Sequence, residues 1–342
     1  MREISIQKNE AGQRMDKFLA KYLNKAPKSF FYKMMRKKNI TLNGKKAAGN
    51  EQLKQGDVIK LFLAEETIEN FIDHSQFSKK KASSAKKQTA GKKVQLDILY
   101  EDEAAVFINK PVGMLSQKAS PTDTSLVEYF VDYLLENGKI TEEELHTFHP
   151  SVCNRLDRNT SGIVAAGKTL QALQGLSEMF RDRTLKKYYL CLVKGQVKEN
   201  QRIHGYLVKN EKTNKVTVSQ KKPAEQTKDG KEASAIDTEY KVLARNRETT
   251  LLEVHLITGK THQIRAHLAS IGHPIAGDYK YGNRSFNDAL KKEYGLRSQL
   301  LHAYRLEFPE NCEGDIKQLS GKIIKAPVPA LFERICKAQG VM

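Results

Sequence analysis

The chain has 342 residues, which is long enough for two or three domains. Its 58 Lys and Arg residues outnumber its 40 Asp and Glu residues, and the formal net charge of +18 predicts a polyanionic partner, either a nucleic acid or an anionic membrane surface. The sequence contains no apolar run long enough to span a membrane, no CxxC pair and no cysteine–histidine spacing typical of a zinc site. These features argue against membrane-spanning, disulfide-stabilised and zinc-ribbon proteins and favour a reducing, cytoplasmic location.

The positive charge is concentrated near the N-terminus, where residues 1–64 hold 15 basic and five acidic side chains. Apolar residues at helical spacing predict one helix over residues 14–23. A second helix is predicted over 28–38, and its polar face is almost wholly cationic. We therefore expect the first fifth of the chain to carry most of the charge that binds the partner.

Alternating residues then predict two strands, one over 40–45 that ends in an Asn-Gly turn and one over 58–63. The order of helix, basic helix, strand, turn and strand resembles the S-four-type RNA-binding domain, which is named from a ribosomal protein of the small subunit. The resemblance covers about residues 13–64, and we assign residues 1–70 to a small αβ domain of this type.

The resemblance implies that basic side chains of this domain contact backbone phosphates, which contribute affinity but no sequence information. A solvated basic face that binds nothing is the alternative. The residues assigned to RNA binding are Arg14, Lys17, Lys28, Lys33, Arg36, Lys37, Lys38 and Lys45.

Residues 71–93 are predicted to form a flexible basic linker. Between residues 75 and 93 there are seven lysines, no acidic residue and almost no apolar side chain. Such a segment cannot bury enough surface to offset its chain entropy. A tether of this kind raises the effective concentration of the second domain at the RNA.

Residues 94–342 are assigned to a larger domain. Its first two strands are predicted over 96–103 and 104–110, and a capping box at Ser125 and Glu128 opens a helix. Residues 220–233 are polar and turn-rich, as expected for the mobile tip of a hairpin. Further helices are predicted over 170–183, from 258 to 268 and after Pro329, and further strands over 187–195, 238–244, 250–257 and 300–308.

One short stretch of this domain contains several charged residues of the kind found in active sites. Asp157 stands between Arg155 and Arg158, and a Thr-Ser-Gly turn follows it and leads into an apolar run that is typical of a buried strand. A carboxylate between cations on a tight loop at the end of a strand is typical of an active site. A structural Asp paired with a neighbouring Arg is the alternative.

The eight positions Arg-Leu-Asp-Arg-x-Thr-Ser-Gly at 155–162 resemble the signature of the RluA-type pseudouridine synthases. Two further stretches follow in the order of that family, Lys-x-Tyr at 187–189 and Thr-Gly-Lys-Thr-His-Gln-Ile-Arg-x-His at 258–267. The resemblance implies the pseudouridine synthase fold, an α+β domain on a mixed, largely antiparallel sheet flanked by helices and loops. With an S-four-type domain in front, the layout resembles the members that modify large-subunit (23S) ribosomal RNA.

The family isomerises uridine in RNA to pseudouridine without a cofactor or a metal. Uracil must be detached from the ribose, rotated and rejoined, which requires an ionised carboxylate near the anomeric carbon. The resemblance assigns this role to Asp157, either as nucleophile or as base. Arg265 matches the arginine that pairs with the catalytic Asp and keeps such a carboxylate ionised, and a surface Arg on a helix face is the alternative.

Tyr189 matches the tyrosine whose ring stacks on the target base. Tyr188 is the alternative, because adjacent strand residues face opposite sides of a sheet. A uridine inside a helix must be extruded before it can react, and Arg155 matches the arginine that enters the stack where the base leaves. Arg158 is expected to make a phosphate or structural contact.

The histidines of these stretches do not predict a metal site, because no HExxH motif or carboxylate triad accompanies them. His262 and Gln263 are assigned to substrate binding, in part as residues that fix a loop by hydrogen bonds. Many members of the family carry His directly before Arg-Leu-Asp-Arg, whereas this chain has Asn154. This departure leaves the subgroup open.

The sequence therefore predicts a pseudouridine synthase that acts on structured RNA, with large-subunit ribosomal RNA preferred over transfer RNA. No membrane and no obligate protein partner are expected. A catalytically silent RNA-binding factor in ribosome assembly is the competing hypothesis, and a basic protein of a membrane surface is the least favoured.

Overall fold

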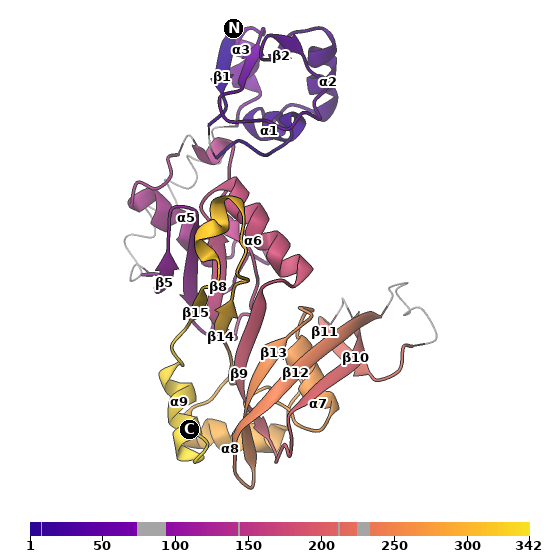
Figure 1. Cartoon of the computed structure of the whole chain (residues 1–342), viewed down its shortest axis with the longest axis vertical. Helices are drawn as coiled ribbons and strands as arrows, with labels where there is room; N and C mark the ends of the chain where they lie inside the picture. Colours follow the sequence, from indigo (N-terminus) through magenta and orange to yellow (C-terminus); the bar gives the residue numbers. More distant parts are fainter. Residues whose placement is uncertain (8, 74–93, 143, 211–212, 224–232) are drawn as a thin grey trace.

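The computed structural model describes residues 1–7, 9–73, 94–142, 144–210, 213–223 and 233–342. Most of the predicted linker, residues 74–93, and most of the predicted hairpin tip, residues 224–232, lie outside these ranges. Within them the strands form one sheet of four strands and one of eleven. Figure 1 shows the small sheet at one end of the long axis of the molecule and the large sheet along the rest.

The small sheet belongs to the N-terminal body, which we define as residues 1–73. Its strands have the order β1-β4-β2-β3, and the turn at Asn43 and Gly44 has φ angles of 49° and 74°, as a tight type I′ turn requires. Buried residues of the helices and the sheet share one core, which includes Ile72 from the first part of the predicted linker. The elements are β1 (Arg2–Ser5), α1 (Met15–Tyr22), α2 (Lys28–Arg36), β2 (Ile40–Leu42), β3 (Lys45–Lys46), β4 (Val58–Leu61) and α3 (Glu65–Asn70).

Two hydrogen bonds between described residues join the N-terminal body to the larger part of the chain. The Thr147 hydroxyl donates to Glu10 Oε1 at 2.6 Å, and the Asn9 side-chain amide donates to Glu144 Oε1 at 3.1 Å. Both partners in the larger part lie in or next to the short 3-10 helix η1 (Glu144–His146). The two parts therefore meet at polar side chains as well as through the connecting segment.

The large sheet has the order β11-β10-β12-β13-β9-β14-β8-β6-β5, with β7 paired to β8 and β15 to β14. Among the described strands, every pair is antiparallel except β8 with β14, which confirms the predicted mixed, largely antiparallel sheet. The strands are β5 (Ile98–Glu101), β6 (Ala105–Lys110), β7 (Ser151–Val152), β8 (Ser161–Gly167), β9 (Lys186–Lys194), β10 (Gln201–Asn210), β11 (Lys215–Ser219), β12 (Ser234–Arg245), β13 (Thr249–Leu256), β14 (Leu301–Glu307) and β15 (Ile323–Lys325).

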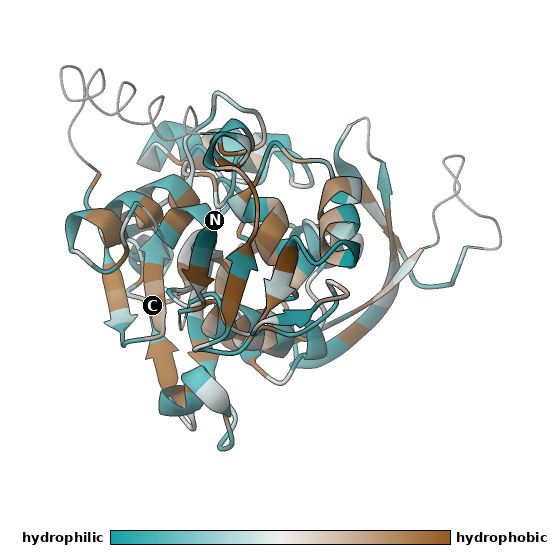
Figure 2. Ribbon diagram, turned by 90° about the horizontal axis from the view of Figure 1, so that it is seen from above, coloured by the Kyte–Doolittle hydropathy of each residue, from teal (hydrophilic) through white to brown (hydrophobic). Residues whose placement is uncertain are grey.

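The central strand β8 is buried along its whole length. Val164 and Ala166 face a core that contains the apolar side of α5, whereas Ile163 and Ala165 face a second core that contains α6. Figure 2 shows this arrangement as central strands with hydrophobic colour beside helices that are hydrophobic on one side and hydrophilic on the other. The helices are α5 (Leu126–Glu136), α6 (Leu170–Asp182), α7 (Gln263–Ser270), α8 (Arg284–Tyr294), α9 (Ala330–Ala338) and the 3-10 helix η2 (Gly314–Leu319).

Gly162, the last residue of the Arg-Leu-Asp-Arg-x-Thr-Ser-Gly run, allows β14 to approach β8. Its φ angle is 111°, and a Cβ atom at this position would lie 2.1 Å from the carbonyl oxygen of Ala303. Only glycine fits such a backbone approach. The parallel pairing of β8 with β14, directly after the Asp157 loop, therefore depends on this residue.

The structure differs from the sequence-based prediction in several elements. The helix expected from residue 258 begins only at Gln263, because residues 258–262 form a loop that ends with His262 at a φ of 54°. The strands β1, β10 and β11 and the helices α3 and α8 were not predicted. None of the helices in the described ranges combines the length and apolar composition that crossing a bilayer requires.

Candidate active site

Asp157 lies in the loop that joins β7 to β8, and neighbouring segments hold this loop by its backbone. The Ser116 hydroxyl lies 3.0 Å from both the Leu156 carbonyl, to which it donates, and the Leu156 amide, from which it accepts. The Gly113 amide donates to the Arg158 carbonyl, and the Thr160 amide donates to the Asp157 carbonyl. Hydrogen bonds on both sides therefore fix the position of the Asp157 side chain.

Lys110 also stabilises the Asp157 loop, through hydrogen bonds to its backbone. Its side chain is fully buried at the end of β6, and its ammonium group donates to the carbonyl oxygens of Pro111, Met114 and Arg158 at 2.8–3.1 Å. Burial lowers the pKa of Lys110 to about 8, against an opposing attraction from Asp157. The three carbonyls match the three N–H donors of an ammonium group, so this lysine acts as a fixed cation behind the loop.

Asn154, which stands where many family members have His, also fixes the loop. Its side-chain amide donates to the Ile163 carbonyl at 3.2 Å, and its oxygen accepts from the Ala165 amide at 2.8 Å. The asparagine therefore bonds the start of the loop to the backbone of β8. It needs one donor and one acceptor for this, which a neutral histidine also offers.

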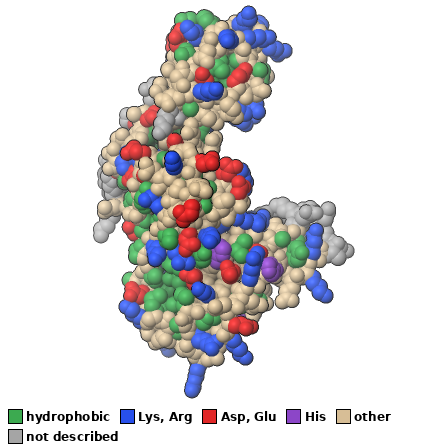
Figure 3. All heavy atoms as spheres, in the orientation of Figure 1, with side chains coloured by type: hydrophobic (Ala, Val, Ile, Leu, Met, Phe, Trp, Pro, Cys, Tyr) green, Lys and Arg blue, Asp and Glu red, His purple; other side chains and the backbone are tan. Residues whose placement is uncertain are grey.

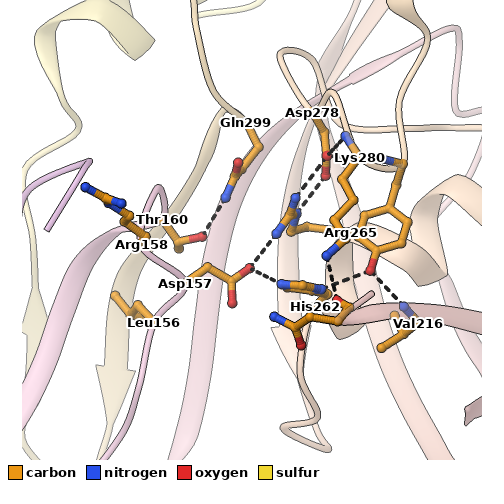
Figure 4. Close-up of polar contacts among 12 residues, drawn as sticks. Leu156, Asp157, Arg158, Thr160, Val216, His262, Arg265, Asp278, Lys280 and Gln299 are labelled. Carbon is orange, nitrogen blue, oxygen red and sulfur yellow. Dashed lines mark hydrogen bonds and ion pairs between the residues drawn. The ribbon is translucent and has the colours of Figure 1, made fainter. Parts of the chain in front are cut away.

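Arg265, on the first turns of α7, joins two carboxylates that are far apart in sequence. Its Nη1 donates to Asp157 Oδ2 at 2.8 Å, and its Nε and Nη2 donate to the two oxygens of Asp278 at 2.7 and 3.0 Å. Figure 4 shows the guanidinium group between the two acids. Burial opposes the charged guanidinium, but the hydrogen bonds and charges of Asp278 and Asp157 outweigh it and keep the pKa of Arg265 raised.

Asp278 is the main residue of the site that the sequence analysis missed. It is buried and also accepts hydrogen bonds from the backbone amides of Lys280 and Tyr281. Its own carbonyl accepts from the side-chain amide of Asn287, at 2.9 Å. The loop after α7 was expected to be ordered, but nothing in its spacing indicated that its one acid turns toward Arg265.

His262 and Gln263 are adjacent in sequence, but their side chains contact different parts of the structure. His262 Nε2 lies 3.8 Å from Asp157 Oδ2, and its Nδ1 lies 2.9 Å from the Tyr281 hydroxyl. The amide group of Gln263 is occupied by Thr258, the Lys260 amide, the Asp237 carbonyl and Thr238. Gln263 therefore ties the loop before α7 to β12, whereas His262 faces the Asp157 carboxylate.

Tyr189 and Tyr188 face opposite sides of β9. Tyr189 is buried and lines a cavity of about 930 Å³ together with Asp157, Leu156 and Arg265. Burial, and then the negative charge of Asp157, raise the pKa of Tyr189. Tyr188 instead stacks on His255, with ring centroids 4.8 Å apart, and carries the Arg305 guanidinium 4.0 Å above its ring.

The cavity is basic at its mouth. Arg155 and Arg158 are both exposed and both line it. Arg158 Nε donates to the Gly113 carbonyl at 3.1 Å, whereas the Arg155 side chain makes no hydrogen bond with any residue in the described ranges. The other basic residues that line the cavity are Lys118, Arg181, Lys187 and Lys260.

The eight basic residues assigned to RNA contact are all exposed on the N-terminal body, and none of them lines the Asp157 cavity. Figure 3 shows Lys and Arg side chains gathered along the edge of this body where Figure 1 places α2. Arg14 differs from the others because its guanidinium group pairs with Asp16, Nη2 to Oδ2, at 2.9 Å. The structure thus separates two basic surfaces, one on α2 and one around the cavity.

The chain is similar in sequence to known proteins over the region that contains Asp157 and Arg265. The family model of RNA pseudouridylate synthases matches residues 104–270. Two bacterial relatives, from Vibrio parahaemolyticus and Salmonella typhi, both carry the name ribosomal large subunit pseudouridine synthase C. The first is 32% identical over 97% of this chain and 94% of its own length, and the second is 32% identical over 94% and 93%.

Among solved structures, the fold resembles that of human RNA pseudouridylate synthase domain containing 4, with a TM-score of 0.57. The two chains are 23% identical, and the match covers 72% of this chain and 94% of the human chain. At this identity the likeness concerns the fold.

Proposed function

The chain belongs to the RNA pseudouridylate synthase family and is a pseudouridine synthase, and we propose that its substrate is uridine in large-subunit ribosomal RNA. The observation that carries this choice is the match to relatives of that name, which extends over 97% of the chain and so includes the N-terminal body. Transfer RNA is the enzymatic alternative, because the motifs around Asp157 are shared across the family.

In this reaction the bond between N1 of uracil and C1′ of ribose breaks, and a bond between C5 and C1′ forms. The proton on C5 leaves and N1 gains a proton, so the reaction consumes no second substrate. The detached uracil must turn within the site without escaping, which requires a closed cavity and an extruded nucleotide. A cavity of about 930 Å³ with an apolar wall and a basic mouth is compatible with this sequence of events.

Within that reaction we assign the catalytic carboxylate to Asp157, which either attacks the sugar or removes a proton from it. The Asp157–Arg265 contact of 2.8 Å supports this assignment, because the cation favours the ionised carboxylate and aims it. We assign stacking on the target base to Tyr189 and insertion into the vacated stack to Arg155, whose side chain is free to move. Arg158 and His262 complete the proposed substrate-binding set, while the contacts of Gln263 favour a supporting role.

We further propose that the N-terminal body is an RNA-binding domain of the S-four type and that residues 74–93 tether it to the larger domain, so that the tether begins three residues later than the sequence analysis expected, because Ile72 belongs to the core of the body. The exposed basic residues at the end of α2, Lys33, Arg36, Lys37 and Lys38, support this proposal. Phosphate contacts by such residues add affinity for RNA of any sequence, which leaves the choice of uridine to the cavity and to RNA shape.

Tritium release from RNA labelled at C5 of uracil tests the substrate. The purified protein is incubated with large-subunit ribosomal RNA, small-subunit ribosomal RNA and bulk transfer RNA, each free of protein and at equal uridine concentration. We expect release from large-subunit RNA that stops at a small whole number of uridines per molecule. Release from transfer RNA alone would refute the proposed substrate but not the activity, and release from no RNA would favour a catalytically silent RNA-binding factor.

A further inference from the structure

His262 stands at a strained position directly beside the Asp157 carboxylate. It precedes α7 with a φ of 54°, a left-handed conformation that costs energy for any residue with a Cβ atom. The side chain is only 9% exposed, and its Nε2 lies 3.8 Å from Asp157 Oδ2. Backbone strain of this kind often accompanies functional side chains, which makes the contacts of the imidazole informative about its role.

The hydrogen bonds of Tyr281 determine which ring nitrogen of His262 carries the proton. The Val216 amide donates to the Tyr281 oxygen at 3.0 Å, so this oxygen already accepts one hydrogen bond. The single hydrogen of the phenol is then directed to His262 Nδ1, 2.9 Å away. We infer on this basis that Nδ1 accepts, which places the proton of the neutral ring on Nε2, the nitrogen that faces Asp157.

The surroundings of His262 favour the neutral ring. Burial is the largest influence and lowers the pKa of His262 below its usual value, and the cations Arg265 and Lys280 lower it further. The acids Asp157 and Asp278 oppose them. The edge-to-face contact with Tyr281, with ring centroids 5.7 Å apart, holds the ring plane.

Both groups that approach the Asp157 carboxylate do so at one oxygen. Arg265 Nη1 donates to Oδ2, and His262 Nε2 faces the same Oδ2, as Figure 4 shows. No hydrogen bond from a residue in the described ranges reaches Oδ1. The two oxygens of Asp157 are therefore not equivalent before any RNA arrives.

We propose that His262 is a positioning residue, whose Nε2–H and the Arg265 guanidinium together hold Oδ2 of Asp157 so that Oδ1 is the oxygen that reacts. The inference rests on the proposed role of Asp157. At 3.8 Å the His262 contact is longer than a hydrogen bond. The proposal requires this contact to shorten when RNA is bound, as catalytic contacts often do. Tyr281 does not contact Asp157 in this proposal and contributes by fixing the tautomer of His262.

The test compares His262→Gln with His262→Leu in single-turnover reactions at saturating enzyme, with melting temperatures measured in parallel. Gln offers a side-chain N–H near the place of Nε2, whereas Leu fills a similar volume without a donor. We expect Leu to lower the rate by about tenfold or more, which is the loss expected for a hydrogen bond to a charged group. Gln should lose less than about threefold in rate, and RNA affinity, measured on the same samples, should fall by a smaller factor than the rate does in His262→Leu.

Tyr281→Phe provides a second, independent variant, because it leaves His262 in place but frees its tautomer. We expect its rate to fall between those of His262→Gln and His262→Leu. A His262→Leu protein as fast as wild type would overturn the inference, as would a His262→Gln protein that melts like wild type but is as slow as Leu. Failure of the proposed function is a separate result, since the wild-type protein itself would then release no tritium.

Discussion

Arg265 has one buried partner and one accessible partner. The side chain of Asp278 is 1% exposed, whereas that of Asp157 is 27% exposed. The bidentate contact with Asp278 holds the plane of the guanidinium group, which leaves Nη1 to reach Asp157. At the residue scale the site is therefore a chain of charges, in which a structural acid orients the cation that in turn orients the proposed catalytic acid.

This arrangement predicts that Arg265→Ala lowers both the reaction rate and the free energy of unfolding. The substitution leaves Asp278 buried without its cation, and removal of one partner of a buried pair typically costs about 3–5 kcal/mol. The two backbone amides that also bind Asp278 place the expected loss near the lower end of that range. Thermal melting and single-turnover rates measured on the same preparation check both effects.

The double variant Arg265→Ala, Asp278→Asn separates stability from catalysis. It removes the unpaired buried charge, so the melting temperature should recover part of the loss, while the rate should stay as low as in Arg265→Ala. If the rate recovers together with the melting temperature, Arg265 has only a structural role.

Single residues of the site could be predicted to different degrees. The motif around Asp157 and the stretch that contains Arg265 identified both residues, although 108 positions separate them. The alternation of β9 led to a choice between Tyr188 and Tyr189, and the structure puts only Tyr189 beside the cavity. Asp278 and Tyr281 gave no signal, because their contacts depend on how a loop folds back over α7 and not on any periodic pattern.

At the scale of elements, the parallel pairing of β8 with β14 places a buried histidine behind the site. His302 on β14 is fully buried, and its Nδ1 lies 2.9 Å from the Ser161 hydroxyl, within hydrogen-bond distance. Burial lowers the pKa of His302 to about 4. The pKa values of His262 and His267 are also lowered, and burial is again the largest cause.

We therefore predict that acid destabilises the fold before most carboxylates titrate. In the unfolded chain a histidine has a pKa near 6.5, so below this pH the unfolded state binds more protons than the folded state and the free energy of unfolding decreases as pH falls. For His302 alone the decrease runs from about pH 6.5 to about pH 4 and amounts to about 3 kcal/mol. Melting temperatures between pH 7.5 and pH 4 measure it.

His302→Asn and His204→Asn form the matched pair for this measurement, because His302 is fully buried and His204 is 68% exposed. The melting temperature of His302→Asn should depend less on pH than that of wild type, and that of His204→Asn should depend on it as in wild type. Equal pH dependence in all three proteins would contradict the role assigned to His302.

Elements with a clear apolar pattern were mostly predictable, and β10 was missed because its pattern is interrupted. In β10 the buried positions are Ile203, Gly205 and Leu207, so a glycine interrupts the apolar alternation. The helix α8 was missed although Phe286, Leu290 and Tyr294 stand at helical spacing and pack against one core. The start of α7 was placed too early because the left-handed conformation of His262 cannot be read from residue types.

At the scale of the whole molecule, two basic surfaces lie on two bodies that are joined by a lysine-rich segment. Counterion release makes such surfaces visible in the salt dependence of RNA affinity. We predict that replacing Lys33, Arg36, Lys37 and Lys38 with alanine weakens RNA binding and lowers the slope of log affinity against log salt concentration by about 3.

A control with the same loss of charge is available outside the N-terminal body and outside the lining of the cavity. Arg284, Lys291, Lys292 and Lys337 are exposed on α8 and α9, and their replacement with alanine also removes one arginine and three lysines. The slope for this control should stay close to that of wild type. Equal slopes for the two quadruple variants would mean that net charge, and not the N-terminal body, determines binding.

The central claim is that Asp157 performs the isomerisation, and single-turnover tritium release by wild type and Asp157→Asn tests it most directly. Asn preserves the shape of the side chain and removes the charge, and RNA affinity is measured on the same samples. Our account predicts full release by wild type, no release above background by Asp157→Asn, and RNA affinity that differs by less than about threefold, because the carboxylate adds no phosphate contact. Tritium release by Asp157→Asn at the wild-type rate would contradict the account.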